Sequence, residues 1–300
     1  MPPATAKTLT IGSRGSPLAL WQARFIAVQL AKAGVESRVE IIKTTGDHMQ
    51  TASLALAGGK GLFTKEIEEA LLSGQIDLAV HSLKDLPTES PEGLTIAAVP
   101  PRANPFDAIV GARLPDLVLG ALVGTSSPRR AAQLRLLRPD LKIEPIRGNV
   151  DTRLRKLREG EFDAILLAAA GLERLGLASE IAEVFTPDRL CPAPGQGALG
   201  VQTRVDDEAQ RICRRLNHQA SSQAVEAERA VLAGLGGGCQ LPVGAYAKVE
   251  NDALELSAVV LAPDRPVLIH SSIAGRAGDA ERLGRCVADD LLRQGAGGLL

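Results

Sequence analysis

Hydrophobic residues recur along the chain in two alternating patterns, short apolar runs and longer stretches with helical spacing. In the N-terminal third, strands are expected near residues 8–11, 38–45 and 76–80, and helices near residues 17–34 and 62–72. The run at 76–80 is mostly apolar, which is typical of a strand buried in a parallel sheet. A chain that alternates strands with helices predicts an α/β fold with right-handed crossovers.

The same alternation starts again after the prolines at positions 100, 101 and 105. A second cluster of proline and glycine, at residues 192–197, separates this run from a strand at 199–202 and a helix that reaches about residue 216. The run itself is expected to hold strands near residues 108–110, 121–124, 143–146 and 164–168, and helices near residues 128–137 and 150–159.

The pattern changes in the C-terminal part of the chain. A helix at residues 221–235 is followed by strands at 243–249, 254–261 and 267–273, and then by a closing helix at 280–292. Several strands in succession, with helices only before and after them, are typical of an α+β domain. The hydrophobic pattern therefore predicts two α/β lobes and one small α+β domain.

Composition excludes several classes of protein. The 300 residues are 45% hydrophobic and 23% charged, as in ordinary globular proteins, so disorder does not describe the whole chain. The net charge is −1, which offers no general attraction to DNA or to a membrane surface. Aromatic residues make up 2% of the chain, too few for a surface that stacks nucleic-acid bases.

Targeting and metal-binding patterns are also missing from the sequence. The N-terminus has no apolar run after a basic patch, and no stretch reaches the roughly 18 apolar residues of a membrane-spanning helix. The four cysteines lie far apart without a C-x-x-C pair, which predicts reduced thiols in a cytoplasmic protein. The four histidines are equally scattered, so no metal site is expected.

Basic residues concentrate between residues 124 and 160. This segment holds ten basic and four acidic residues, a net charge of +6, while the remainder of the chain carries −7. Arg129 and Arg130 fall in the first turn of a predicted helix, where the helix dipole disfavours cations. Arg147 precedes a second helix start, with Arg153 one turn into that helix. This placement favours an anion-binding site in which Arg129, Arg130 and Arg147 face a wet cleft.

Three further segments hold candidate functional residues, and each can also be explained without a function. Lys60 lies in a glycine-rich segment that resembles a phosphate loop but lacks its hydroxyl residue. Asp85 and Lys84 follow a predicted strand, where they form either a surface ion pair or a proton-transfer site. Cys239 follows three glycines, so it is either an exposed nucleophile or an ordinary thiol. Cys213 and Cys286 are both expected in helix cores.

Seven ordered sequence blocks closely resemble the porphobilinogen deaminase family, also called hydroxymethylbilane synthase. The resemblance extends from about residue 11 to the C-terminal helix and so covers nearly the whole chain. The blocks read SRGSPLALWQ from residue 13, GGKGLF from 58, VHSLKDLP from 80, GTSSPRR from 124, RGNV from 147 with TRL from 152, PGQGA from 194, and GGCQLPVG from 237.

The resemblance implies a transferase of haem and other tetrapyrrole biosynthesis. Such an enzyme joins four porphobilinogen molecules head to tail, with release of ammonia, into the linear tetrapyrrole hydroxymethylbilane. The resemblance also implies two lobes like periplasmic binding proteins with a cleft between them, followed by a small α+β domain. The first lobe would comprise residues 1–100 and 196–217, the second residues 104–192, and the C-terminal domain residues 220–300. A cytoplasmic monomer that binds no nucleic acid and no membrane is expected.

The resemblance also assigns residues to roles. A dipyrromethane cofactor would be joined to Cys239 by a thioether, and Asp85 would be the catalytic acid. Other cofactor-binding residues would be Ser82, Lys84, Thr125, Ser127, Arg129, Arg130, Arg147 and Gly148. Substrate-binding residues would be Arg14, Ser16, Lys60, Arg153 and Arg174.

Elementary chemistry agrees with these roles. Each pyrrole ring of the substrate carries an acetate and a propionate, so a nearly neutral protein must concentrate cations locally to hold the growing chain. Loss of the aminomethyl nitrogen leaves a cationic pyrrole, which an ionised Asp85 would stabilise before it helps to remove the ring proton. Lys84 beside it would favour the ionised carboxylate.

Two positions depart from the family pattern. Gly15 stands where many relatives have glutamine, and Leu56 where some have lysine, so an auxiliary contact is expected to be missing. Two other functions are weighed against the enzyme. A two-lobed anion receptor does not account for the missing signal peptide or for Cys239, and an RNA-binding protein does not account for the scarcity of aromatic residues.

Overall fold

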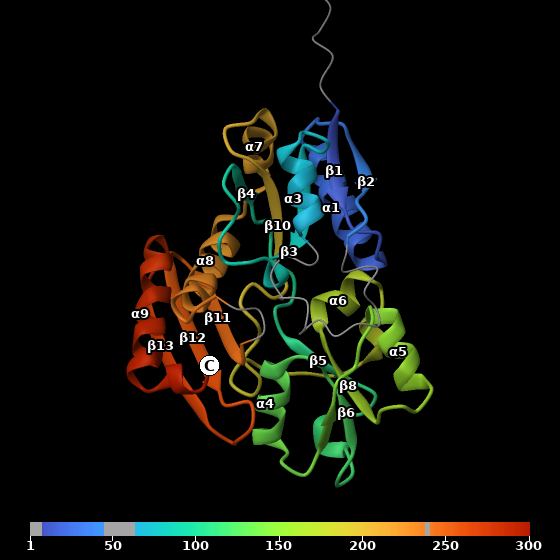
Figure 1. Ribbon diagram of the computed structural model, residues 1–300, viewed down its shortest axis with the longest axis vertical. Helices are drawn as coiled ribbons and strands as arrows, with labels where there is room; N and C mark the ends of the chain where they lie inside the picture. Colours follow the sequence, from blue (N-terminus) through green and yellow to red (C-terminus); the bar gives the residue numbers. More distant parts are fainter. Residues whose placement is uncertain (1–7, 45–63, 238–240) are drawn as a thin grey trace, which may run out of the picture. The chain divides into compact units, whose positions relative to one another are not determined.

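A computed structural model of the chain describes residues 8–44, 64–237 and 241–300 (Figure 1). The chain divides into two compact units, and each unit is built from two separate segments of the sequence. The first unit comprises Met1–Pro101 and Leu199–Gln219, and the second comprises Arg102–Ala198 and Ala220–Leu300. The further division of the chain into three domains stays a prediction.

The first unit contains a five-stranded mixed sheet in the order β2-β1-β3-β10-β4. Strand β1 pairs in parallel with β2 and β3, whereas β10 pairs antiparallel with β3 and β4. Strand β3 was expected in a parallel sheet, which is correct for its neighbour β1 and wrong for its neighbour β10. The chain returns to this sheet beside β3 and runs in the opposite direction. The strands are β1 (Leu9–Ser13), β2 (Ser37–Ile41), β3 (Leu78–Ser82), β4 (Leu94–Ala98) and β10 (Leu199–Arg204).

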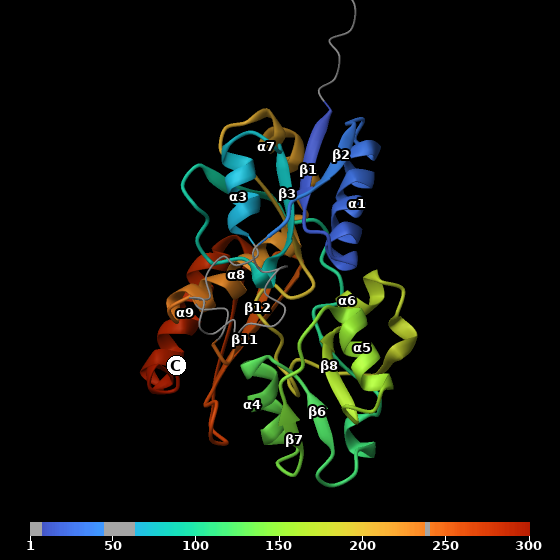
Figure 2. The ribbon, with the colours of Figure 1, turned by 45° about the vertical axis from the view of Figure 1, so that its right-hand side comes forward.

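Helices cover both faces of this sheet. Helix α1 (Pro17–Lys32) and helix α7 (Glu208–Cys213) pack on one face, while α3 (Lys65–Leu72) packs on the other. Alternate residues of β3 face opposite sides, so that Val80 joins the α1 cluster and Ala79 the α3 cluster. Figure 2 shows α1 and α3 on opposite sides of strands β1 and β3.

The second unit contains a mixed sheet in the order β7-β6-β8-β5-β9. Strand β6 pairs in parallel with β7 and β8, and β5 pairs antiparallel with β8 and β9. Helix α4 packs on one face, and helices α5 and α6 pack on the other (Figure 1). The elements are β5 (Asp107–Val110), β6 (Leu122–Gly124), α4 (Pro128–Leu137), β7 (Lys142–Glu144), α5 (Val150–Arg158), β8 (Ala164–Ala168), α6 (Ala169–Arg174) and β9 (Ile181–Val184).

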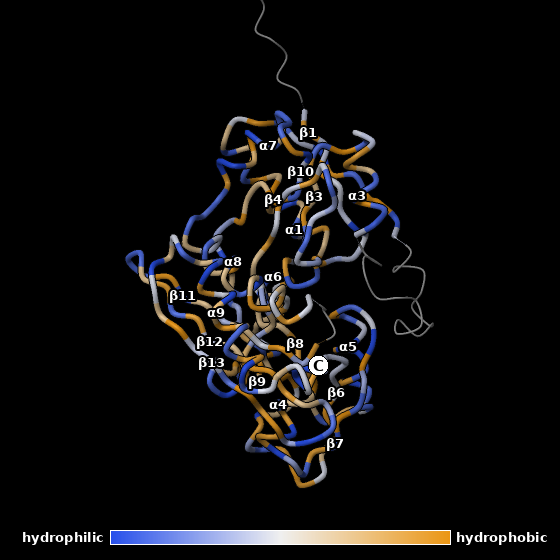
Figure 3. Tube along the Cα trace, turned by 60° about the vertical axis from the view of Figure 1, so that its left-hand side comes forward, coloured by the Kyte–Doolittle hydropathy of each residue, from blue (hydrophilic) through white to orange (hydrophobic). Residues whose placement is uncertain are grey.

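The same unit also holds an antiparallel three-stranded sheet in the order β11-β12-β13. Helices α8 and α9 cover one face, where Leu256 and Val260 of β12 join the core, while Val259 and Leu261 face Ala132 of helix α4. Figure 3 shows how hydrophobic and hydrophilic positions mix along these strands. The elements are α8 (Gln219–Gly234), β11 (Val243–Glu250), β12 (Ala253–Leu261), β13 (Leu268–Arg276) and α9 (Ala280–Arg293).

This architecture confirms the expected fold class, a mixed α/β chain with two sheet–helix lobes and a small C-terminal sheet. Among the strands and α-helices of the described residues, β4, α6 and β9 were not expected from the sequence. Within the described residues, no helix is long and apolar enough to cross a membrane. The same part of the chain holds no group of three or more His, Cys, Asp or Glu side chains placed to hold a metal ion.

Candidate functional site

The first unit gathers predicted site residues at one edge of its sheet. Because β1 and β3 are parallel neighbours, the segments that follow them leave the sheet at the same edge. Arg14 and Ser16 follow β1, and Ser16 also caps helix α1 by accepting a hydrogen bond from the Ala19 N–H. Lys84 and Asp85 follow β3 in a single 3₁₀ turn, in which Lys84 is half-buried and Asp85 is exposed. This edge of the sheet therefore carries an exposed carboxylate and both predicted cations.

Ser82, the last residue of β3, is held from the α1 side of the sheet. Gln22, a 3% exposed residue of helix α1, donates a hydrogen bond from Nε2 to the Ser82 Oγ atom at 2.9 Å. Because the hydroxyl oxygen accepts this bond, the Ser82 O–H can still donate to another acceptor. Ser82 thus keeps the donor that a ligand carboxylate would need.

His81 is held from the opposite face. Its Nε2 atom lies 3.0 Å from Oε1 of Gln202 on β10, and Nε2 of Gln202 donates to Oε1 of Glu68 on α3 at 3.2 Å. Burial lowers the pKa of His81 to about 4, although the Gln202 bond opposes the shift. Burial likewise raises the pKa of Glu68. A chain of polar side chains, of which His81 and Gln202 are buried, therefore joins α3 to the strand that leads to Asp85.

The second unit gathers a second group of predicted residues in the same manner. Its parallel strands β7, β6 and β8 are neighbours, so the segments after them leave at one edge of the sheet. Thr125 and Ser127 follow β6, and Ser127 caps helix α4 through a hydrogen bond from the Arg130 N–H. Arg147 is exposed and follows β7, and Arg174 ends helix α6 after β8.

Gly148 and Arg153 form one local structure. The Arg153 Nε donates to the Gly148 carbonyl at 2.8 Å. Gly148 has a φ of +112°, and a Cβ added there would lie 2.6 Å from the Cγ2 atom of Thr152. Only glycine fits this position without strain. The turn therefore brings bare backbone and an arginine to the start of helix α5.

Arg174 is largely enclosed. Its guanidinium donates to the carbonyl of Gly197 at 2.7 Å. Burial lowers its pKa to about 10, against the opposing charge of Glu173. Arg174 nevertheless stays protonated at neutral pH and brings a cation to the PGQG segment.

Arg129 and Arg130 do not face a wet cleft, and that part of the prediction is wrong. They are 3% and 6% exposed, and both bind Asp107, which is fully buried at the start of β5. Arg129 reaches Oδ2 of Asp107 at 2.8 Å, and Arg130 reaches Oδ1 at 2.6 Å. Burial alone would raise the pKa of Asp107, but the charges of the two guanidinium groups bring it well below its usual range. A protein carboxylate thus takes the place of the expected external anion, and one positive charge remains in excess.

Sequence reasoning missed the polar residues that complete this cluster. Gln196 donates from Nε2 to Oδ1 of Asp107 at 3.0 Å and to the Pro105 carbonyl at 2.8 Å. The only signals in the sequence were an acid directly before an apolar run, at Asp107, and a glutamine inside PGQG. Neither pattern shows that residues 89 positions apart meet.

A second missed cluster surrounds Glu228, a fully buried residue of helix α8. Its carboxylate accepts two hydrogen bonds from Arg102, at 2.7 and 3.0 Å. It also accepts from the Gly195 and Ala247 N–H groups, at 2.7 and 2.8 Å. Glu228 thereby connects the PGQG segment to the third sheet.

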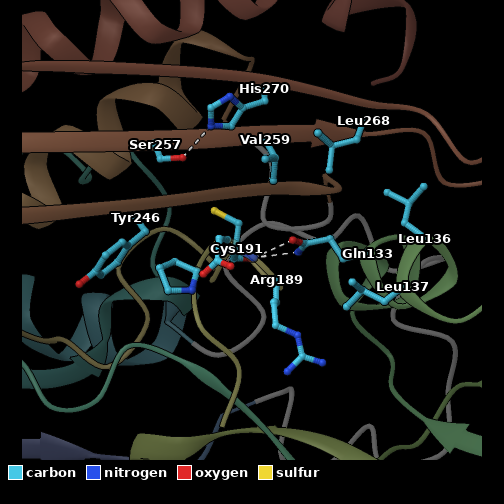
Figure 4. Close-up of a pocket in the computed structure, with 12 residues that line it drawn as sticks. Gln133, Leu136, Leu137, Arg189, Cys191, Tyr246, Ser257, Val259, Leu268 and His270 are labelled. Carbon is cyan, nitrogen blue, oxygen red and sulfur yellow. Dashed lines mark hydrogen bonds between the residues drawn. The ribbon is translucent and has the colours of Figure 1, made fainter. Parts of the chain in front are cut away.

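A pocket of about 530 Å³ lies between helix α4 and the outer face of the third sheet. Figure 4 shows Ser257 and His270 paired at one side, where Ser257 Oγ is 3.0 Å from His270 Nε2. On the other side, Gln133 bonds both the N–H and the carbonyl of Cys191, at 2.7 and 3.0 Å. Arg129 donates to the same carbonyl, so the pocket wall helps to fix its guanidinium.

Two of the predicted site residues, Cys239 and Lys60, lie outside the described residues. Cys191 and Cys213 are buried free thiols, and burial raises the pKa of each to about 12. Both thiols are therefore protonated at neutral pH and poor nucleophiles. The expectation that Cys213 belongs to the core is confirmed, whereas the same expectation for Cys286 is wrong because this residue is partly exposed on helix α9.

Comparisons with known proteins match nearly the whole chain to a single family. Residues 9–211 match the family described as "Porphobilinogen deaminase, dipyromethane cofactor binding domain", and residues 222–293 match "Porphobilinogen deaminase, C-terminal domain". The porphobilinogen deaminase of Roseiflexus sp. (strain RS-1) is 53% identical over 98% of this chain and 99% of that protein. That of Thermus thermophilus is 52% identical over 96% of this chain and 97% of that protein.

Among solved structures, a periplasmic substrate-binding protein of an ABC transporter from Coxiella burnetii is 14% identical to this chain. It covers 74% of this chain and 97% of its own, with a TM-score of 0.44.

Proposed function

The chain belongs to the porphobilinogen deaminase family, and we propose that it condenses four porphobilinogen molecules head to tail into hydroxymethylbilane, with release of ammonia. The observation that supports this activity most directly is the edge of the first sheet, where Ser82, Lys84 and the exposed Asp85 end or follow β3 and Arg14 follows the neighbouring strand β1. Hydroxyl and cationic groups there suit the carboxylates of a pyrrole. The single carboxylate suits the ring nitrogen and its developing positive charge.

Asp85 is assigned the proton-handling role. It stabilises positive charge on the reacting pyrrole when the aminomethyl nitrogen leaves as ammonia, and after the carbon–carbon bond forms it helps to remove the ring proton. Arg14 binds carboxylates of the substrate, whereas Lys84, the neighbour of Asp85 in the 3₁₀ turn, binds those of the dipyrromethane. Ser82 and Ser16 add hydroxyl groups at the same edge.

The residues of the second unit fit the family's dipyrromethane group. A dipyrromethane carries carboxylates, and the edge formed by β7, β6 and β8 presents Arg147 together with the hydroxyls of Thr125 and Ser127. Arg153 and Arg174 of the same edge bind carboxylates of the substrate. The bare backbone at Gly148 allows close approach of a ligand. When bound, this group supplies the pyrrole ring from which the chain grows.

Buried arginines and two residues outside the described part of the chain are also assigned roles. Arg129 and Arg130 act on bound carboxylates through the net positive charge of their cluster with Asp107, rather than as exposed side chains. Cys239 is proposed as the thioether attachment point and Lys60 as a further carboxylate-binding cation. We place the enzyme in the cytoplasm, as expected for the biosynthesis of a small soluble intermediate.

The experiment that tests this function compares Asp85→Asn and Asp85→Glu with the wild type in single-turnover ammonia release from porphobilinogen. Asn accepts a hydrogen bond but neither balances a cation nor takes a proton, so turnover should fall by about 10²–10⁴. Glu keeps the charge and should retain more activity than Asn.

Melting curves provide the control for this experiment. Asp85 is exposed, so both variants should melt close to the wild type. Near-normal ammonia release by Asp85→Asn would reject the proposed role, as would a loss that unfolding fully explains.

A further inference from the structure

The turn that presents Asp85 is attached to the sheet through Leu83. This side chain is 1% exposed, and it packs over Gly200 of the neighbouring strand β10. A Cβ added to Gly200 would lie 2.7 Å from Cδ2 of Leu83, so a larger residue there would displace this side chain. The position of the turn therefore depends on how β3 and β10 are held together at this end.

Side chains hold that end of β3 from both faces of the sheet. On the α1 face, Gln22 bonds Ser82. On the α3 face, His81 pairs diagonally across the strands with Gln202, which in turn bonds Glu68. His81, Gln202 and Gln22 are all buried, and the bond between His81 and Gln202 is shielded from competing water.

The orientation of the Gln202 amide sets the direction of the hydrogen bonds on the α3 face. Gln202 donates its amide N–H to Glu68, so its amide oxygen faces His81 and can only accept. His81 must therefore carry a proton on Nε2 to bond this oxygen. An apolar residue at position 81 would leave the Gln202 oxygen buried without a donor.

We propose that His81 is a positioning residue for Asp85: through Gln202 and Glu68 it fixes the end of β3, and hence the turn that carries the carboxylate. The inference rests on the proposed function of Asp85 and deepens it. A displacement of about 1 Å in a catalytic group costs on the order of 10²-fold in rate. His81 thus affects the rate without touching the substrate.

The test uses four variants of the intact, cofactor-loaded enzyme. His81→Leu removes the donor, and His81→Gln restores an N–H near the position of Nε2. Gln202→Met cuts the chain of bonds while leaving His81 in place, and it serves if His81→Leu does not fold. Gln75→Leu is the matched control, because Gln75 is an exposed glutamine of the same unit that bonds Glu40 on β2.

Single-turnover ammonia release should fall about 10–100-fold in His81→Leu and Gln202→Met, with the KM for porphobilinogen little changed. His81→Gln should recover most of the rate, and Gln75→Leu should match the wild type. Backbone amide exchange provides a readout that is independent of activity. It should accelerate at residues 83–86 in the two disruptive variants and stay unchanged in the control.

A double-variant cycle separates positioning from general stability. If His81 acts through Asp85, adding His81→Leu to Asp85→Asn should lower the rate no further, whereas an unrelated defect should multiply with it. A multiplicative result would overturn the proposal, as would normal ammonia release by folded His81→Leu. Normal release by Asp85→Asn would instead reject the proposed function of Asp85 itself.

Discussion

At the residue scale, burial decides what a charged side chain can do. Arg129, Arg130 and Arg147 look alike in the sequence, since each stands near a helix start. In the structure two of them share the buried Asp107, while Arg147 is exposed. A sequence pattern can predict that cations gather at strand ends, but it cannot predict which cations the protein neutralises itself.

Replacing Asp107 should therefore lower the stability of the fold, whereas replacing Arg147 should weaken ligand binding. Asp107→Asn removes the carboxylate that both arginines share and leaves two buried guanidinium groups, so it should destabilise the fold by about 3–5 kcal/mol. Arg147→Leu should leave the free energy of unfolding nearly unchanged and weaken binding of the anionic chain by roughly 1.5–3 kcal/mol. Denaturant unfolding and steady-state kinetics of both variants check this contrast. Equal stability of the two variants would contradict it.

The pKa of His81 predicts a pH dependence of stability. In the unfolded chain this group protonates near its ordinary pKa of 6.5, whereas burial lowers its pKa to about 4 in the folded protein. The unfolded state therefore binds more protons between these values, and stability should fall as the pH decreases from 6.5 toward 4. At pH 5 the loss from this group is on the order of 2 kcal/mol.

Unfolding of wild type and His81→Gln at pH 7 and pH 5 measures that loss. Glutamine does not titrate, so the variant should lose less stability than the wild type between the two values. An equal loss in both proteins would show that His81 does not titrate as its burial requires.

At the element scale, most strands and helices followed from hydrophobic spacing. Helix α4 was predicted at its observed bounds, and β8 likewise. The missed elements had weaker signals: β9 is four residues long, and α6 begins directly after β8 with no turn between them. The reversed direction of β10 was invisible because spacing along a strand carries no information about its partners.

Glu228 shows how elements far apart in sequence are held together. It bonds Arg102, the first residue of the second unit, and also Gly195 and Ala247. Glu228→Gln should cost about 3–5 kcal/mol, because it leaves Arg102, whose side chain is 9% exposed, without its anion.

Glu281→Gln is the matched control for that variant, since Glu281 pairs with Arg285 on the surface of α9 with 57% of its side chain exposed. Loss of such a pair should change the unfolding free energy by no more than about 1 kcal/mol. Chemical denaturation compares the two. Similar midpoints would show that the Glu228 contacts do not stabilise the fold.

At the scale of the whole molecule, function was predicted better than geometry. Seven sequence blocks identified the family before any fold was known, and the family models cover residues 9–211 and 222–293. The sequence also placed Asp85 after a strand, where the structure has it. The sequence could not predict the roles of Asp107, Gln133 and Gln196, because these residues act through contacts between segments that are far apart in the chain.

The central claim is that this chain builds a tetrapyrrole on a dipyrromethane attached to Cys239. Intact mass spectrometry of the purified protein, before and after addition of porphobilinogen, tests it most directly. The mass should exceed that of the sequence by two pyrrole units, Cys239→Ser should remove this excess, and porphobilinogen should add further single pyrrole units to the wild type. An active protein of unmodified mass, or an adduct on Cys191, Cys213 or Cys286, would contradict the account.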